Sequence, residues 1–193
     1  MSNEEKVSLK KYTSDLYSLE KHFMNSVKRQ KSSDKVRDEK AIDLLHEIDK
    51  IVSNHVQVLE RHVEKDGTLK EELKSKFMSI SGSFSGLIEG DRNDVLSKMM
   101  RDNYTALSMI AIGYTLLHTH ALVDDNQELA ALAQNHLTHC TSLITEISKL
   151  APMTLAHELI HDHDRAEEIG KKALGNTQSA WKSEVINKDP QIV

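Results

Sequence analysis

A His-Glu-x-x-His pattern near the C-terminal end carries the most familiar chemistry in this sequence. His157 and His161 lie four residues apart, and Glu158 follows the first of them. On a continuous helix this spacing places both imidazoles on one face, where they bind Zn²⁺ in zinc peptidases while the glutamate activates water. The strand-bearing domain and the third ligand that such enzymes need are not visible in the sequence. A zinc peptidase is therefore our third functional hypothesis, and adventitious metal binding by these histidines is the simpler interpretation.

A second set of ionisable residues interrupts helical stripes that are otherwise apolar. Glu20 flanks the stripe of the first predicted helix, Asp102 lies on that of the third, and the fourth carries His136 and His139. A buried charge or imidazole needs a partner or a metal ion. With a rise of about 1.5 Å per residue, the three helices bring these side chains to a similar depth in a bundle. We therefore predict that these four residues form a metal site, for which iron and zinc are the candidate ions.

The second predicted helix fits this layer less well. At the matching depth it offers His46, and His55 lies about two turns lower. Both histidines are further candidate ligands. A histidine on an apolar stripe, as at His55 and His136, could instead be a hydrogen-bonded core or groove residue, and Asp102 could instead complement the dipole near the start of its helix. The second and fourth helices also lack the Glu-x-x-His pair that a di-iron bundle site requires.

Composition and periodicity indicate which elements position these side chains. The chain has 193 residues, of which only seven are Gly, two are Pro and 4% are aromatic, and this disfavours sheets and favours a few long helices. Apolar residues at three- and four-residue steps predict four such helices, and Pro152 is expected to end the last of them. Their approximate ranges are 4–30, 41–66, 93–123 and 127–150. The predicted fold is an all-α four-helix bundle whose two hairpins are joined by one long crossover over about 67–92.

Beyond the bundle we expect a short additional helix and a tail. Residues 1–174 form one predicted domain that includes an extra helix over about 154–173, and residues 175–193 form a frayed tail. Gly113, alone inside a helical stripe, predicts a close approach of the third helix to a neighbour. Cys140, on the inner stripe of the fourth helix, is expected to be a buried thiol with a raised pKa and little reactivity.

Charge and terminal sequence exclude several classes of partner. The formal net charge is −5, from 25 basic and 30 acidic residues that form no basic stripe of the kind that neutralises nucleic acid. The first residues lack the features of a signal peptide, and no run of about 18 apolar residues is present. We expect a cytoplasmic protein without a nucleic-acid or membrane partner, and we leave any small-molecule substrate open.

Residues 15–22 have the sequence DLYSLEKH. Three further segments follow in order, 59–60, 102–104 and 136–147. Together the four segments resemble a family of ferritin-like bacterial stress proteins of unknown function that are distantly related to rubrerythrins. The first segment is similar to the family's DLYxxEKQ opening, and the other three match by order, spacing and character over roughly residues 8–150. The resemblance implies a ferritin-like bundle that self-associates, with a candidate di-iron centre and no firmly assigned reaction.

The metal ligands implied by this resemblance are incomplete. Glu20 matches the family's first-helix carboxylate, and Asp102 is a conservative match for its third-helix glutamate. Ile51 stands where the second helix places a carboxylate, and Asn135 and His136 stand where the fourth has glutamates. Our leading hypothesis is therefore a non-enzymatic, stress-associated, homo-oligomeric bundle whose di-iron site is degenerate or absent. The alternative is a working metal-binding or iron-oxidising bundle protein.

Overall fold

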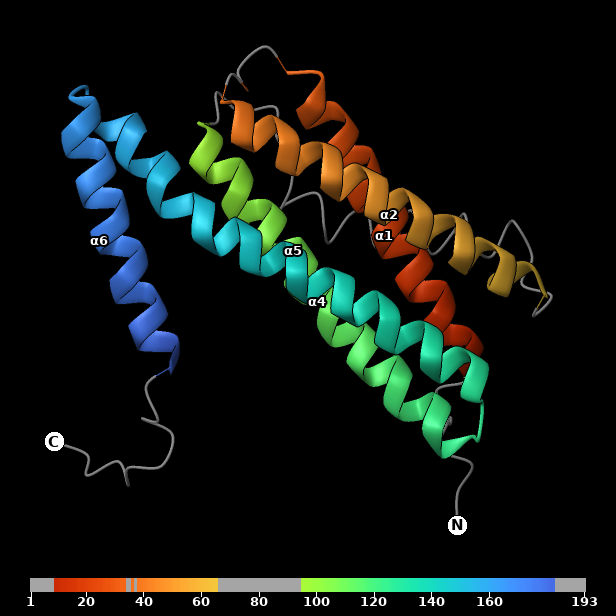
Figure 1. The fold of residues 1–193 in the computed structure, drawn as a ribbon. Helices are drawn as coiled ribbons and strands as arrows, with labels where there is room; N and C mark the ends of the chain where they lie inside the picture. The colour runs from red at the N-terminus through yellow and green to blue at the C-terminus, as the bar shows by residue number, and fades with distance from the viewer. Residues whose placement is uncertain (1–8, 34–35, 37, 66–94, 183–193) are drawn as a thin grey trace, which may run out of the picture.

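A computed structural model describes residues 9–33, 36, 38–65 and 95–182, and this part of the chain is helical throughout apart from short links (Figure 1). The predicted all-α fold class is confirmed. The helices are α1 (Leu9–Lys31), α2 (Glu39–Lys65), α4 (Leu96–Val123), α5 (Gln127–Leu159) and α6 (His163–Lys182). The predicted crossover over 67–92, and the last residues of the predicted tail, 183–193, lie outside the described residues.

The four long helices pack as two antiparallel pairs, α1 with α2 and α4 with α5, and the pairs meet through α1 against α4 and α2 against α5. Within each pair, the residues that contact one another occur in opposite order along the two helices, as antiparallel packing requires. Such contacts are Tyr17 with Glu60, Glu20 with His55, Lys31 with Asp49, Tyr114 with His136, and Met100 with Thr154. Since α2 and α4 run in the same direction, the end of α2 and the start of α4 lie at opposite ends of the bundle (Figure 1).

Apolar side chains at helical spacing form the core between these helices. Fully buried examples are Phe23, Ile48, Leu59, Leu107, Ile110, Leu117, Leu143 and Ile147. The tight turn from α4 to α5 uses the predicted polar residues, with Asp125 at a φ of 56° and the Asn126 side chain accepting a hydrogen bond from the Leu129 amide. The side-chain oxygen of Asn126 thereby satisfies one of the unpaired amides at the start of α5.

The predicted end of the fourth helix at Pro152 was wrong. Proline removes one backbone hydrogen bond from a helix interior, yet α5 continues to Leu159 because the residues beyond the proline are packed. Thr154 and Ala156 are buried, and the Thr154 hydroxyl lies 3.5 Å from the sulfur of Met100 on α4. Tertiary contacts therefore stabilise the last two turns.

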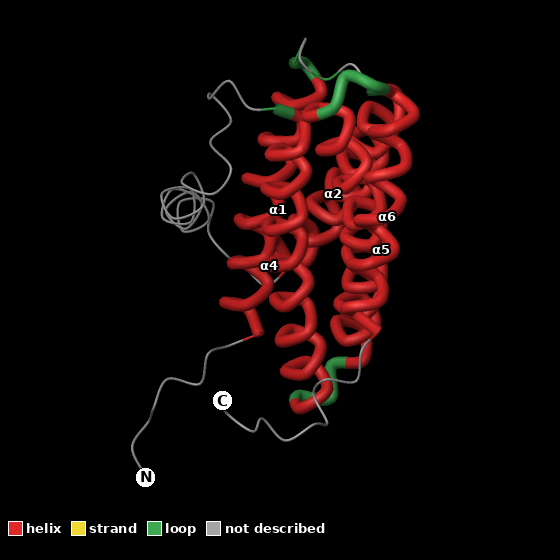
Figure 2. Tube along the Cα trace, turned by 90° about the vertical axis from the view of Figure 1, so that its left-hand side faces the viewer, coloured by secondary structure: helices red, strands yellow, loops and turns green. Residues whose placement is uncertain are grey.

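The extra helix expected over 154–173 is consequently displaced along the chain. The structure has α6 over His163–Lys182, so part of the segment predicted to be a frayed tail is helical. The Asp162 side chain accepts a hydrogen bond from the Arg165 amide at its start. Among the described helices α6 packs on α5, along its outer side (Figure 2).

Two glycines mark close approaches between helices. A Cβ atom on Gly113 would lie 2.7 Å from Cδ2 of Leu16, so the predicted close approach is between α4 and α1. A Cβ atom on Gly170 would lie 2.6 Å from the sulfur and 3.1 Å from the Cα atom of Met153, so α6 lies equally close to α5. Both glycines allow backbones to approach more closely than any larger residue would.

One helix, α4, is long and apolar enough to cross a membrane when judged by length and composition alone. Its most apolar window has a mean hydropathy of 1.4, and 39% of that window is buried inside the fold. One such helix is weak evidence for a membrane span, because helices that line a protein core pass the same test.

Candidate metal-binding core cluster

A group of buried polar side chains lies between the four long helices, each of which contributes to it. We call it the core cluster. Its members are Glu20 from α1, His55 from α2, Tyr114 from α4, and His136, His139 and Cys140 from α5. All are buried except His139, which is partly exposed.

His55 is the central residue of the core cluster. Its Nδ1 lies 2.9 Å from Oε1 of Glu20, and its Nε2 lies 3.0 Å from Nδ1 of His139. The ring of His136 stacks on that of His55, with centroids 3.7 Å apart, and its Nδ1 lies 2.8 Å from the Tyr114 hydroxyl. One carboxyl group and three imidazoles thus form a continuous network inside the bundle.

Burial favours the uncharged form of every group whose pKa it shifts here. Desolvation raises the pKa of the Glu20 carboxyl well above its ordinary value, and the nearby Tyr114 hydroxyl opposes this to a smaller extent. Desolvation lowers the pKa of both His55 and His136 to about 3, and it raises that of the Cys140 thiol, as the sequence predicted. Glu20 and His55 therefore form a neutral hydrogen-bonded pair rather than an ion pair.

Three side chains of the core cluster are arranged so that one metal ion could bind all of them. One potential ligand atom from each of Glu20, His55 and Cys140 lies within 4.8 Å of the other two. The Oε2 atom of Glu20 is buried and has no hydrogen-bond partner at normal geometry. The Tyr114 hydroxyl is the neighbouring donor that lowers the pKa of this carboxyl, but its short contact, at 2.8 Å, is with Nδ1 of His136. Such a buried atom without a partner is costly in a protein core. A metal ion would satisfy it.

The predicted metal-site residues are only partly brought together. Glu20, His136 and His139 meet as expected, and His55 joins them despite its apparent mismatch in depth. Asp102 does not: it lies near the start of α4, where its carboxylate pairs with Arg101 at 2.7 Å. His46 is also outside the cluster, because its side chain is exposed on α2.

On α4 the inward residue next to Asp102 is Asn103, which exchanges two amide hydrogen bonds with Gln30 of α1, at 2.8 and 3.1 Å. The residue that reaches the core cluster from α4 is Tyr114, about 18 Å further along the helix. Sequence reasoning missed Tyr114 because it searched for acids and imidazoles. It placed Cys140 on the inner stripe but did not consider it as a ligand.

The His-Glu-x-x-His pattern does not form a zinc peptidase site. α5 ends at Leu159 and Ile160 is extended, so His157 and His161 are not on one helical turn. Glu158 instead accepts hydrogen bonds from the backbone amide, at 2.9 Å, and from the hydroxyl of Ser97. It thereby satisfies an amide at the start of α4, whose own first residues supply no such cap.

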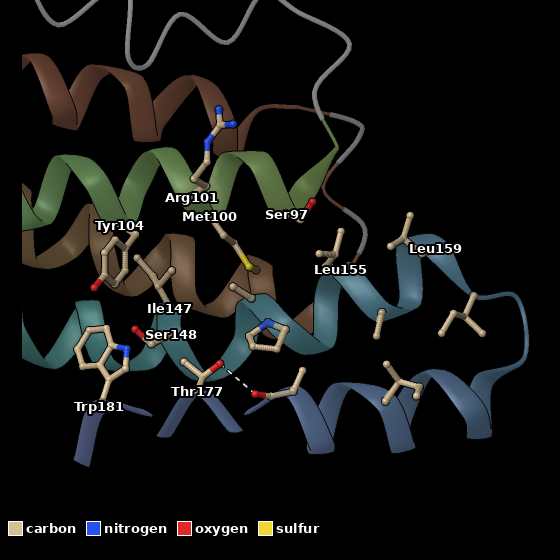
Figure 3. Close-up of a pocket in the computed structure, with 16 residues that line it drawn as sticks. Ser97, Met100, Arg101, Tyr104, Ile147, Ser148, Leu155, Leu159, Thr177 and Trp181 are labelled. Atoms are coloured by element: carbon tan, nitrogen blue, oxygen red, sulfur yellow. Dashed lines mark hydrogen bonds between the residues drawn. The ribbon is translucent and has the colours of Figure 1, made fainter. Parts of the chain in front are cut away.

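A second feature, separate from the core cluster, is an apolar groove between α4, α5 and α6 (Figure 3). It has a volume of about 600 Å³, and Tyr104 and Trp181 stand together at one end, with Leu159 toward the other. Of the polar side chains along it, Ser97, Arg101, Ser148 and Thr177 are already hydrogen-bonded. Most of the other lining residues are apolar, so the groove offers contacts chiefly to an apolar group.

Comparison with known proteins adds no identification. No protein family, curated protein or solved structure matches this chain. A function must therefore be argued from the geometry of the core cluster.

Proposed function

We propose that this protein is a metal-binding helical bundle that holds one divalent transition-metal ion of the zinc type in its core cluster. Glu20, His55 and Cys140 are the protein ligands, with His55 binding through Nδ1, on the side of Glu20. The observation that carries the proposal is the convergence of these three donors around the unpartnered Oε2 atom of Glu20. Carboxylate, imidazole and thiolate are the ligands that zinc takes in tetrahedral protein sites.

Charge balance supports a single divalent ion. Binding would deprotonate the Glu20 carboxyl and the Cys140 thiol, giving two negative charges, while His55 stays neutral. One divalent cation with these ligands has no net charge, which an apolar core tolerates far better than an unbalanced one. A di-iron centre carries at least four positive charges, and Glu20 is the one carboxyl group of the core cluster. This favours a mononuclear site over the di-iron centre of the ferritin-like family.

The partner of the second imidazole nitrogen fits a metal-binding role for His55. A metal-bound histidine usually donates its other N–H group to a hydrogen-bond acceptor, which holds the ring in place. Nε2 of His55 lies 3.0 Å from Nδ1 of His139, so His139 can accept this hydrogen bond. The paired antiparallel helices, with α2 and α4 running in the same direction, support a ferritin-like bundle as the scaffold.

The proposal is tested by metal content and thermal stability of the full chain, purified without a His-tag. We expect one zinc per chain by elemental analysis. We also expect the metal-free protein to gain about 2.7 kcal/mol of stability when free Zn²⁺ reaches 100 times its Kd. Cys140→Ala should abolish both effects. His157→Ala, which changes an exposed histidine outside the core cluster, is the matched control and should keep both.

Two results would contradict the proposal. Absence of stoichiometric metal binding would show that the core cluster is only a hydrogen-bonded part of the core. Two irons per chain would point instead to the iron-oxidising alternative.

A further inference from the structure

We propose that the metal ion reaches the core cluster through the seam between α2 and α5, along a row of histidines that begins at His62 and Glu128 and ends at His139 and His55. This inference rests on the proposed metal-binding function and adds the route of exchange. We call these residues, together with His136, the histidine seam.

The core cluster is closed on its other sides. Glu20, His55, Tyr114 and Cys140 have no exposed surface. The α1–α4 side is blocked by the contact of Leu16 with Gly113. The most exposed cluster member is His139, whose Nδ1 lies 3.0 Å from Nε2 of His55. Of the pairs of neighbouring helices in the described part of the chain, α2 and α5 are the most sparsely packed. A bound ion therefore has its shortest path to water between these two helices.

A second pair of potential ligands lies further along the same seam. Nε2 of His62 on α2 is 3.9 Å from Oε1 of Glu128 on α5, and their side chains are 22% and 73% exposed. His62 follows His55 by seven residues, so both lie on one face of α2, about 10 Å apart along its axis. An imidazole beside a carboxylate attracts a divalent cation without requiring its full dehydration.

Within the core cluster, His136 lies toward the outer pair of His62 and Glu128. Its ring stacks on His55, and it is close enough to His62 for that imidazole to contribute to the lowering of its pKa. An ion held at His62 and Glu128 would therefore meet a series of imidazole nitrogens at each step inward.

The test measures rates of metal exchange in the full chain with Co²⁺, whose bond to the Cys140 thiolate absorbs in the near ultraviolet. Stopped-flow mixing of metal-free protein with Co²⁺ gives the association rate, and competition with a chelator gives the dissociation rate. In His62→Gln we expect both rates to fall severalfold, because the ion loses one ligand along the path in both directions, while Kd stays unchanged. A residue that contacts the ion only during exchange changes the activation free energy in both directions and does not change the free energies of the bound and free states.

His46→Gln is the matched control, because His46 is an exposed histidine on the same helix, outside the seam. It should leave both rates at the wild-type values. Unchanged rates in His62→Gln, with Co²⁺ still bound at the core cluster, would refute the route but not the metal site. A change in Kd with an unchanged association rate would show that His62 binds the ion in the final complex and does not act during exchange. This result would also refute the route. Failure of the wild-type protein to bind Co²⁺ would instead refute the proposed function.

Discussion

Replacing Glu20 with Gln should stabilise the metal-free protein at pH 7, even though the same change removes a proposed metal ligand. The Glu20 carboxyl is fully buried, and desolvation raises its pKa well above the ordinary value of 4.5. The unfolded chain ionises this group above pH 4.5, whereas the folded protein keeps the proton. Folding stability therefore falls with rising pH between the unfolded pKa and the folded one. Gln does not titrate, and its amide can donate to Nδ1 of His55 in place of the carboxylic acid.

The size of the effect follows from this linkage. Each pH unit over which only the folded protein holds the proton costs about 1.4 kcal/mol. At pH 7, about 2.5 units above the ordinary pKa of the carboxyl, the cost has a ceiling of about 3 kcal/mol. Glu20→Gln should thus have almost no effect at pH 4.5 and an increasing stabilising effect toward pH 7, with an upper limit of about 3 kcal/mol at pH 7.

Urea denaturation in the presence of a chelator, at several pH values from 4.5 to 8, measures this difference. Glu47→Gln is the control, because Glu47 is exposed on α2, and its effect should not change with pH. If Glu20 and His55 were a charged ion pair, removing the carboxylate would leave a buried charge and cost about 3 to 5 kcal/mol. A large loss of stability in Glu20→Gln at pH 7 would therefore refute a neutral core cluster.

Two further predictions concern acid and the packing of α6. The first is measured in the same Gln variant. Burial is the main reason that the pKa of His55 and of His136 falls from 6.5 to about 3 in the folded protein, so below pH 6.5 the unfolded chain binds more protons than the folded one. Stability should therefore be complete above pH 6.5 and fall by about 1.4 kcal/mol per pH unit for each histidine as the pH drops toward 3, and a flat urea midpoint over this window would contradict it. Gly170→Ala should lower the melting temperature because its Cβ would meet Met153, whereas Gly175→Ala, with open space around it, should stabilise α6 by about 0.5–1 kcal/mol, and equal effects would refute the packing argument.

Much of the fold could be predicted from the spacing of apolar residues, because this spacing indicates which face of each helix is buried. The spacing of apolar residues identified the four long helices, and the isolated glycine at 113 marked a close approach that the structure places against Leu16. The same reasoning identified Glu20, His55 and His136 as polar residues on or beside apolar stripes, and all three are buried. A buried side chain is a property of one helix and its periodicity, so the sequence carries it.

Axial offsets between helices were decided by the tertiary structure alone. Depth measured from the α1–α2 link put His46 opposite Glu20, but α2 extends well past the end of α1, as the contact of Lys31 with Asp49 shows. This offset brings His55 to Glu20 instead. On α4 the same kind of offset puts Tyr114, rather than Asp102, at the level of the core cluster. Offsets of about two to three turns depend on how side chains interdigitate across an interface, and periodicity within a single helix carries no information about them.

The end of α5 likewise separates what the sequence predicts from what tertiary packing decides. From the sequence, Pro152 is a stop signal and the spacing of His157 and His161 is a zinc motif, since each conclusion follows from local rules. Packing of Thr154 and Ala156 carries the helix past the proline, and the chain then leaves the helix inside the motif. Sequence alone determined which residues are able to bind a metal. Only the tertiary structure decided which of them meet, because a binding site is a set of distances between different helices.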